Sequence, residues 1–204
     1  MQLDFEAKSH TYSLAGAPLP SVSKIKAPLT DFSMVSPEIM AAAQAWGHAV
    51  HRMVELYLAE TLDFSALDEN LFGPLEAFER WLAEVKPFQA GPAIIDVKSR
   101  KFDRVADPVQ LAAYHQLYLE AGLTEVAIER PMASVTHRFA GTPDIIIPGD
   151  GPIINHRILY LGRDGKYQYT PCYDRNAWPV FGRLLADHHR QQATNEIIHA
   201  WRNR

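Results

Sequence analysis

The chain has 204 residues, 47% of them hydrophobic and 22% charged, so it is long enough to bury a core and suits a globular protein. Its net charge of −4 argues against a protein that coats nucleic acid by charge alone, but not against an enzyme that gathers carboxylates around a divalent cation. A single cysteine, Cys172, excludes an internal disulfide and a four-cysteine zinc or iron–sulfur site.

The first half of the chain predicts a small β element followed by two helices. In residues 1–30, "HTYSL" and "SVSKI" alternate polar and apolar side chains on either side of the turn-like "AGAPLP", which predicts a β-hairpin. Residues 36–60 predict a long helix, because Ser36 can cap it and apolar residues recur at helical spacing. Residues 73–86 predict a second amphipathic helix that Pro87 closes.

The second half of the chain predicts alternating strands and helices. "AIIDVK" predicts a short buried strand, and "PVQLAAYHQLYLEAG" predicts a helix that Asp107 caps and Gly122 ends. "TEVAIERPMAS" and "HRFAGTPDIIIPGDG" look like the two strands of a hairpin. "RILYLGRDGKYQYT" predicts another hairpin, with Asp164 and Gly165 at its turn. A helix from about residue 177 to residue 201 follows.

Helices interleaved with short strands indicate an α/β (α+β) layer fold, in which helices flank one central mixed β-sheet. We expect residues 1–204 to form a single domain, with a β-hairpin appendage at 1–30, a core at 36–175 and a C-terminal helix at 176–204. No run of about 18 apolar residues marks a membrane span, and the first ten residues lack the pattern of a secretion signal. We therefore expect a cytoplasmic protein without a membrane partner.

Asp96 and Lys98 in "IIDVKS" are the first candidates for a catalytic site. They are two residues apart, so on a strand they share one face. That arrangement suits a carboxylate that binds a cation beside an amine that orients or deprotonates a water. The ordinary alternative is an exposed strand end whose acid and lysine form an ion pair.

Asp144 and His51 are the next candidates. In "RFAGTPDIII", Asp144 opens a strongly β-forming run and could project into a cleft, although a turn acid that caps its own backbone is the favoured explanation when this motif is taken alone. Gly47, His51 and Glu55 lie on one face of the predicted helix at successive turns. A glycine inside a helix costs about 1 kcal/mol relative to alanine, so Gly47 hints at the close approach of another backbone. His51 alone could also be a packing or surface residue.

Gln110 and Tyr114 lie one turn apart on the helix that follows the "AIIDVK" strand. Side chains at this spacing lie on the same face of a helix and could act on one site. The ordinary alternative is a solvated glutamine and a half-buried aromatic residue.

Together these motifs resemble the PD-(D/E)xK phosphodiesterase superfamily, in particular its RecB-like and lambda-exonuclease-like nucleases of phages. "GHAVH" is similar to the GxxxH helix motif of that group, "AGTPD" to its aGtxD motif, "DVK" to (D/E)xK and "QLAAY" to QxxxY. The opening "HTYSLAGAPLPSVSKI" resembles the HxY…G…LPSVT opening of phage members. The likeness spans roughly residues 5–170.

The resemblance implies a restriction-endonuclease-like core and a metal-dependent deoxyribonuclease, specifically an exonuclease that processes DNA ends in phage or bacterial recombination and repair. The implied cofactor is Mg²⁺ or Mn²⁺, and histidine as a ligand favours Mn²⁺. The implied partners are DNA and a single-strand-annealing recombinase. The sequence does not indicate an oligomeric state.

The resemblance also implies a role for each candidate residue. The implied metal ligands are His51, Asp144, Asp96 and the Val97 carbonyl, with Glu129 as an additional acid. Lys98 would lie beside the attacking water, and Gln110 and Tyr114 would support the scissile phosphate or the lysine.

The order of the motifs departs from the family pattern, because "DVK" precedes "AGTPD" here. Where the family would place its acid and lysine after "AGTPD", this chain reads "GDGPIINHR", with Asn155 and Arg157. In one interpretation the chain is rearranged and the four motifs still converge, since a metal's coordination shell does not depend on chain order. In the other, the order is retained, and a neutral Asn155 with a permanently charged Arg157 makes the site degenerate.

We favour the rearranged interpretation, because "DVK" followed by "QLAAYHQLYLEAG" keeps the strand-to-helix unit of the family whole. The alternative function is a catalytically inactive DNA-binding or interaction protein on a nuclease fold. A small-molecule hydrolase is disfavoured, since the sequence has no nucleophile-elbow pattern and no Ser/His/Asp constellation.

Overall fold

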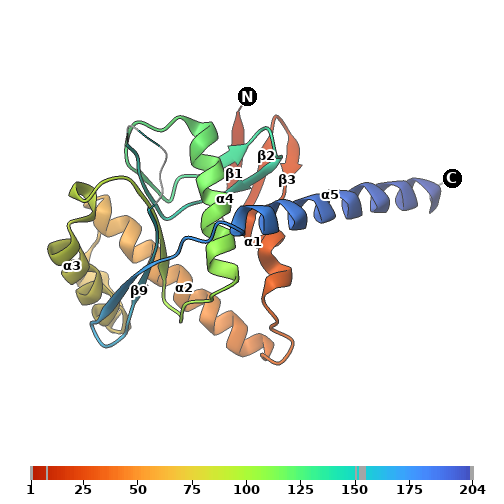
Figure 1. Ribbon diagram of the computed structural model, residues 1–204. Coiled ribbons are helices and arrows are strands. Elements are labelled where there is room, and N and C mark those ends of the chain that lie inside the picture. The colour runs from red at the N-terminus through yellow and green to blue at the C-terminus, as the bar shows by residue number, and fades with distance from the viewer. Residues whose placement is uncertain (1, 8, 150, 152–154, 203–204) are drawn as a thin grey trace.

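The computed structural model describes residues 2–7, 9–149, 151 and 155–202. Within these residues a mixed β-sheet lies among helices, and a separate antiparallel sheet forms near the N-terminus (Figure 1). The fold is therefore mixed α/β with a mixed central sheet, as predicted. The expected domain ranges and the "GDGPIINHR" segment include residues outside this description, namely 1, 8, 150, 152–154 and 203–204.

The N-terminal sheet contains one strand more than the expected hairpin. Strands β1 (Leu3–Glu6), β2 (Thr11–Leu14) and β3 (Ala17–Leu19) pair antiparallel in that order. Gly16, with φ of +79°, turns the chain between β2 and β3. "AGAPLP" thus supplies both a turn and the third strand.

The expected strand "SVSKI" is instead helix α1 (Val22–Lys26), which the short 3-10 turn Ala27–Leu29 extends. The Ser21 hydroxyl caps α1 by accepting a hydrogen bond from the Lys24 N–H at 3.1 Å. Val22 and Ile25 are buried at helical spacing. The alternation in so short a segment fits either period, and burial of this apolar pair favours the helix.

The central sheet has the strand order β10-β9-β4-β8-β5. Its strands are β4 (Ala93–Lys98), β5 (Ala127–Ile128), β8 (Ile145–Ile147), β9 (Asn155–Leu161) and β10 (Tyr167–Pro171). Strand β4 lies in the middle, parallel to β9 and antiparallel to β8. The β9–β10 hairpin is confirmed, with Gly165 at its turn at φ of +73°.

The expected hairpin between "TEVAIERPMAS" and "HRFAGTPDIIIPGDG" divides into two short pairings. Strand β5 pairs with β8 in the central sheet, whereas β6 (Met132–Ser134) pairs with β7 (Phe139–Gly141) outside it. The division follows Glu129, whose φ of 44° turns the chain away, and Pro131, which has no N–H to donate to a ladder.

The long helices lie close to their expected positions. They are α2 (Pro37–Leu58), α3 (Phe72–Val85), α4 (Ala106–Ala121) and α5 (Ala177–Arg202), with short 3-10 segments at Phe64–Ala66, Glu69–Leu71 and Pro87–Gln89. The Ser36 hydroxyl caps α2 by accepting from the Ile39 N–H at 3.3 Å. Gly122, at φ of 59°, ends α4 as predicted.

The expected capping role of Asp107 is wrong. The Asp103 carboxylate accepts hydrogen bonds from the N–H groups of Val105 and Ala106, both at 2.9 Å, at the start of α4. Asp107 is buried in the first turn, where its carboxylate accepts from Arg100 at 2.6 Å and from the Asp103 N–H at 2.7 Å. The negative charge of Asp107 therefore holds the loop between β4 and α4.

Two apolar cores lie on opposite faces of the central sheet. Ile94, Ile146 and Ile158 pack on the face covered by α1, α4 and α5, whereas Ile95, Ile145 and Leu159 face α2 and α3. Side chains alternate between faces along a strand, so both faces of β4 are buried. Helix α5 extends away from the rest of the molecule (Figure 1). None of the helices in the described residues combines the length and apolar character needed to cross a bilayer.

Candidate metal centre

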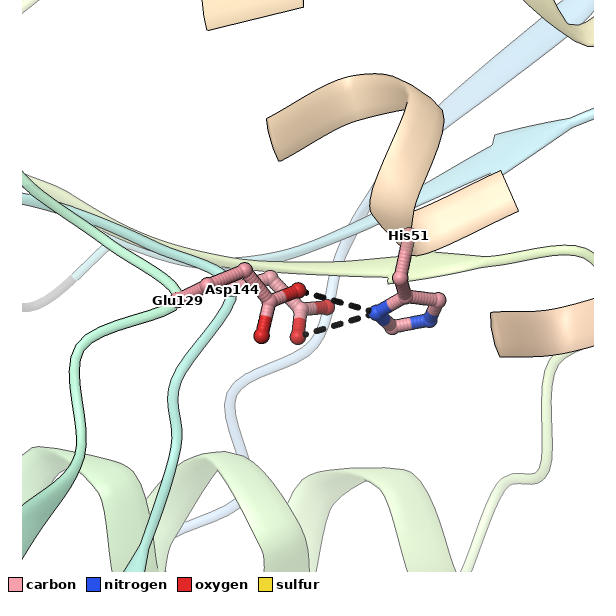
Figure 2. Close-up of side chains that lie close together, drawn as sticks. All are labelled: His51, Glu129 and Asp144. Atoms are coloured by element: carbon pink, nitrogen blue, oxygen red, sulfur yellow. Dashed lines mark hydrogen bonds and ion pairs between the residues drawn. The ribbon is translucent and has the colours of Figure 1, made fainter. Parts of the chain in front are cut away.

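Three side chains that lie far apart in the sequence meet beside the C-terminal part of β4. His51 Nδ1 lies 3.2 Å from Glu129 Oε1 and 3.3 Å from Asp144 Oδ1. The imidazole projects from α2 toward the two carboxylates, which come from the segments that adjoin β5 and β8 (Figure 2). One ligand atom from each residue lies within 4.8 Å of the others. We call these three residues the triad.

The triad has a donor set that fits a divalent metal ion. It offers one imidazole nitrogen and two carboxylate oxygens, and the side chains of His51 and Glu129 are 30% and 22% exposed, which leaves a side open to ligands. Glu129 also has a left-handed backbone, and its N–H donates to the Asp144 carbonyl at 2.9 Å. Such a conformation in a non-glycine residue often marks a functional constraint.

A second cluster connects β4 with α4. Lys98 Nζ lies 2.6 Å from Asp96 Oδ2, and Gln110 Nε2 donates to Asp96 Oδ1 at 2.9 Å and to the Tyr114 hydroxyl at 3.0 Å. Lys98 Nζ donates to Gln110 Oε1 at 3.4 Å. All four residues are buried. The ordinary alternatives, namely an exposed ion pair, a solvated glutamine and a half-buried tyrosine, are therefore wrong. We call these four residues the lysine network.

A backbone hydrogen bond joins the lysine network to the triad. The Val97 N–H donates to Asp144 Oδ2 at 2.5 Å, so the strand between Asp96 and Lys98 holds the Asp144 carboxylate directly. The metal-ligand role expected for the Val97 carbonyl stays a prediction, since the contact in the described residues is made by the N–H. Asp96 faces the lysine network and does not belong to the triad, so its ligand role also stays a prediction.

The acids of the site repel one another. Burial, with the charge of Asp144, raises the pKa of Glu129 to about 7. Burial also raises the pKa of Asp96 to about 6, although Lys98 opposes the shift. Burial alone would lower the pKa of His51, but the charges of Asp144 and Glu129 raise it well above its usual range. An excess of carboxylates that protonate this readily marks a place where a cation would be stabilised.

The N-terminal sheet holds the segment that carries Asp144. The buried Tyr12 hydroxyl shares a 2.7 Å hydrogen bond with Thr142 Oγ1, and the Ala140 N–H donates to the Pro20 carbonyl at 3.0 Å. The "HTY" and "AGTPD" motifs therefore contact each other, which sequence reasoning did not foresee. The sequence offers one signal for this contact, because both motifs are among those that resemble the PD-(D/E)xK superfamily.

Gly141 allows three elements to meet behind the site. A Cβ at this position would lie 2.9 Å from Val22 Cγ2 and 3.0 Å from Tyr114 Cε1. The glycine of "AGTPD" thus lets β7, α1 and α4 pack together. The close backbone approach expected at Gly47 is wrong, because a Cβ there would meet only the Ser99 hydroxyl at 3.7 Å, an ordinary contact.

Asn155 and Arg157, the residues of the degenerate alternative, have other contacts. Asn155 Nδ2 donates to the Pro92 carbonyl at 2.9 Å, and the Arg157 guanidinium lies over the Tyr169 ring at 5.3 Å from its centroid. The residues that converge are those of the rearranged interpretation.

Lys26 is a residue of the site that sequence reasoning missed. Its ammonium group donates a short hydrogen bond to Gln110 Oε1. The sequence predicts a strand over "SVSKI", directly before Lys26, and no spacing rule connects Lys26 with Gln110, 84 residues away. Lys26 directly follows the "HTYSLAGAPLPSVSKI" opening, and this position is the signal that the sequence offers.

Comparisons of this chain with family models, with curated proteins and with solved structures gave no match. The functional interpretation therefore depends on the geometry described above.

Proposed function

We propose that the protein is a metal-dependent DNA phosphodiesterase, an exonuclease that processes DNA ends in phage or bacterial recombination and repair, with Mg²⁺ or Mn²⁺ as its cofactor. The observation that carries this proposal is that His51, Glu129 and Asp144 converge beside the buried Lys98–Asp96 pair. Carboxylates and an imidazole can hold a cation, and an adjacent ammonium group can contact a phosphate, so the arrangement suits metal-dependent hydrolysis of a phosphodiester.

The chain's own residues would divide the work between the two clusters. His51, Glu129 and Asp144 would hold the metal, and the Val97 N–H would fix the orientation of the Asp144 carboxylate. When bound, the metal would lower the pKa of a coordinated water and neutralise charge on the phosphate. A protonated lysine has no lone pair, so a carboxylate of the site, and not Lys98, would accept the proton of the attacking water.

Lys98 would act as a proton-bearing donor. Burial lowers the pKa of its ammonium group, but the charges of Asp96 and Asp144 outweigh burial and raise it. Lys98 Nζ therefore keeps its proton and can donate a hydrogen bond to a phosphate oxygen or to the leaving group. Gln110, held by Asp96 and Tyr114, orients the lysine.

The test is cleavage of linear double-stranded and single-stranded DNA with Mn²⁺ or Mg²⁺. We expect wild-type protein to digest DNA, and we expect Asp144→Asn and Lys98→Ala to lower the rate at least about 100-fold through loss of metal and of the donor. Asp68→Asn is the matched control, because Asp68 is an exposed helix cap that asparagine can replace.

Calorimetric titration with Mn²⁺ separates the roles of the two clusters. Asp144→Asn should abolish metal binding, whereas Lys98→Ala should retain it. Wild-type protein that binds DNA without cutting it in either metal would contradict the proposal and favour an inactive DNA-binding protein. Equal cleavage by all variants would indicate a different site.

A further inference from the structure

Helix α1 delivers a second lysine to the candidate site. Val22 and Ile25 are buried in the core beneath α4, and this packing places Lys26, the last residue of α1, against Gln110. The segment just before α1 fixes the start of the helix, because Pro20 and Ser21 bridge to Ala140 of β7. The position of the Lys26 ammonium group is therefore set by tertiary packing.

Two ammonium groups converge on one amide oxygen. Gln110 Nε2 is committed to Asp96 and Tyr114, so Gln110 Oε1 is the acceptor that remains for Lys98 Nζ and Lys26 Nζ. An amide carbonyl is neutral, so it orients the two cations without compensating their charge. Like charges held this close repel each other, and Asp96, which is paired with Lys98, offsets only part of that repulsion at Lys26.

The two lysines differ in how their charges are balanced. Lys98 is paired with Asp96, whereas no ion pair among the described residues includes Lys26, whose hydrogen-bond partner there is Gln110. An ammonium group has three N–H donors, and one is used on Gln110. Burial, with the nearby charge of Lys98, lowers the pKa of Lys26 to about 8. Lys26 is only partly buried, so a ligand can reach it.

We propose that Lys26 and Lys98 together form an anion-binding clamp that binds the non-bridging oxygens of a DNA phosphodiester. Phosphate fits because lysine binds it as a point charge and because two ammonium groups can contact different oxygens of one group. The choice of a DNA phosphodiester depends on the proposed function; the clamp for a phosphate group rests on the lysine geometry alone.

The clamp and the triad would act on opposite sides of one substrate group. The carboxylates of the triad favour a cation, whereas the Lys26 ammonium, which no ion pair among the described residues includes, favours an anion. A phosphate bound to a metal ion satisfies both. Helix α1 would then be part of the substrate-binding site, because it carries Lys26.

The test uses Lys26→Gln, which can still donate to Gln110 Oε1 but has no charge. We measure binding of a labelled oligonucleotide with non-hydrolysable phosphorothioate linkages, and of inorganic phosphate by its ³¹P signal. We expect Lys26→Gln to weaken both about tenfold, and Lys26→Arg to restore most of the loss. Lys24→Gln, an exposed lysine on the same helix, should remain within about twofold of wild type.

The same variants separate this proposal from the proposed function. Mn²⁺ binding should be unchanged in Lys26→Gln, and its KM for DNA should rise more than its kcat falls. A residue that only positioned Gln110 would lower kcat and leave phosphate binding intact, which would overturn the clamp. Wild-type affinity of Lys26→Gln for both probes, or no binding of either probe by wild type, would overturn it too. Phosphate binding that depends on Lys26 without Mn²⁺ binding or cleavage would support the clamp and contradict the nuclease.

If Lys26→Gln does not fold, as judged by circular dichroism, Lys26→Met replaces it in the same binding measurements. Methionine keeps the aliphatic stem that packs along α4 and removes the ammonium group. The same two probes and the same outcomes then decide the proposal.

Discussion

The buried His156 and the half-buried His115 form a pair away from the triad. His156 Nε2 and His115 Nδ1 lie 3.0 Å apart, and His156 is only 4% exposed. Burial, with the nearby charge that His115 would carry, lowers the pKa of His156 to about 4. The folded protein therefore holds this imidazole neutral at a pH where the unfolded chain already protonates it.

We expect this pair to destabilise the protein as the pH falls. Because the folded pKa lies below the unfolded value, the unfolded chain binds more protons between about pH 6.5 and pH 4, so stability is lost downward through that window. His156→Gln does not titrate. The free energy of unfolding of wild type relative to His156→Gln should fall by about 2 kcal/mol from pH 7.5 to pH 5.

Urea unfolding at the two pH values measures this difference, and subtraction of the variant removes the contributions of other titrating groups. If the difference between wild type and His156→Gln does not depend on pH, the pKa of His156 is the same in the folded and the unfolded protein.

Individual candidate residues could be named from the sequence, but their grouping could not. Asp144, His51 and Lys98 were named because each belongs to a short motif whose spacing is local. Which acids lie beside His51 depends on side-chain directions at the ends of three different strands, so the sequence does not show that Asp96 pairs with Lys98 and lies outside the triad. Lys26 had no motif of its own.

At the scale of elements, Gly141 decides how closely α1, α4 and β7 can pack. Gly141→Ala would place a methyl group within 3.0 Å of Val22 and Tyr114, and both of these side chains are buried. We expect it to lower the free energy of unfolding by about 1–3 kcal/mol through overpacking. Gly182→Ala in α5 is the control, because nothing lies within 4 Å of its added Cβ.

Gly182→Ala should instead stabilise the protein by up to about 1 kcal/mol, through helix propensity. Urea unfolding curves of both variants provide the measurement. Equal stabilities of Gly141→Ala and wild type would show that α1 can move away from β7 without cost.

A helix or strand could be predicted from the sequence where its cap, turn residues or apolar periodicity lie within its own residues. Helix α2 has its cap and its apolar periodicity within its own residues, and the β9–β10 turn has Asp164 and Gly165. Helix α1 has five residues, too few to define a period, and is stabilised by burial against α4. The expected single hairpin failed for a related reason, since β5 pairs with β8 across an intervening hairpin.

At the scale of the whole molecule, the outer part of α5 contributes little to the core. Its side chains from residue 190 to residue 202 are exposed, whereas Phe181 and Leu185 in its first turns are buried. We expect removal of residues 191–204 to shift the midpoint of thermal unfolding by no more than about 2 °C.

A second truncation, after residue 176, is the comparison. It removes Phe181 and Leu185 from the core beneath α4, and we expect this protein not to fold. Differential scanning calorimetry distinguishes the two results. A large loss of stability in the shorter truncation would show that the exposed end of α5 has a stabilising partner.

The central place of β4 has a consequence for how the protein is made. Its two neighbours in the sheet, β8 and β9, both follow it by dozens of residues, so β4 leaves the ribosome without either of them. Until both arrive, its carboxylate and its amine remain hydrated, and its isoleucines remain exposed to chaperones or to aggregation. Most of the polypeptide must therefore be synthesised before β4 can be buried between its neighbouring strands.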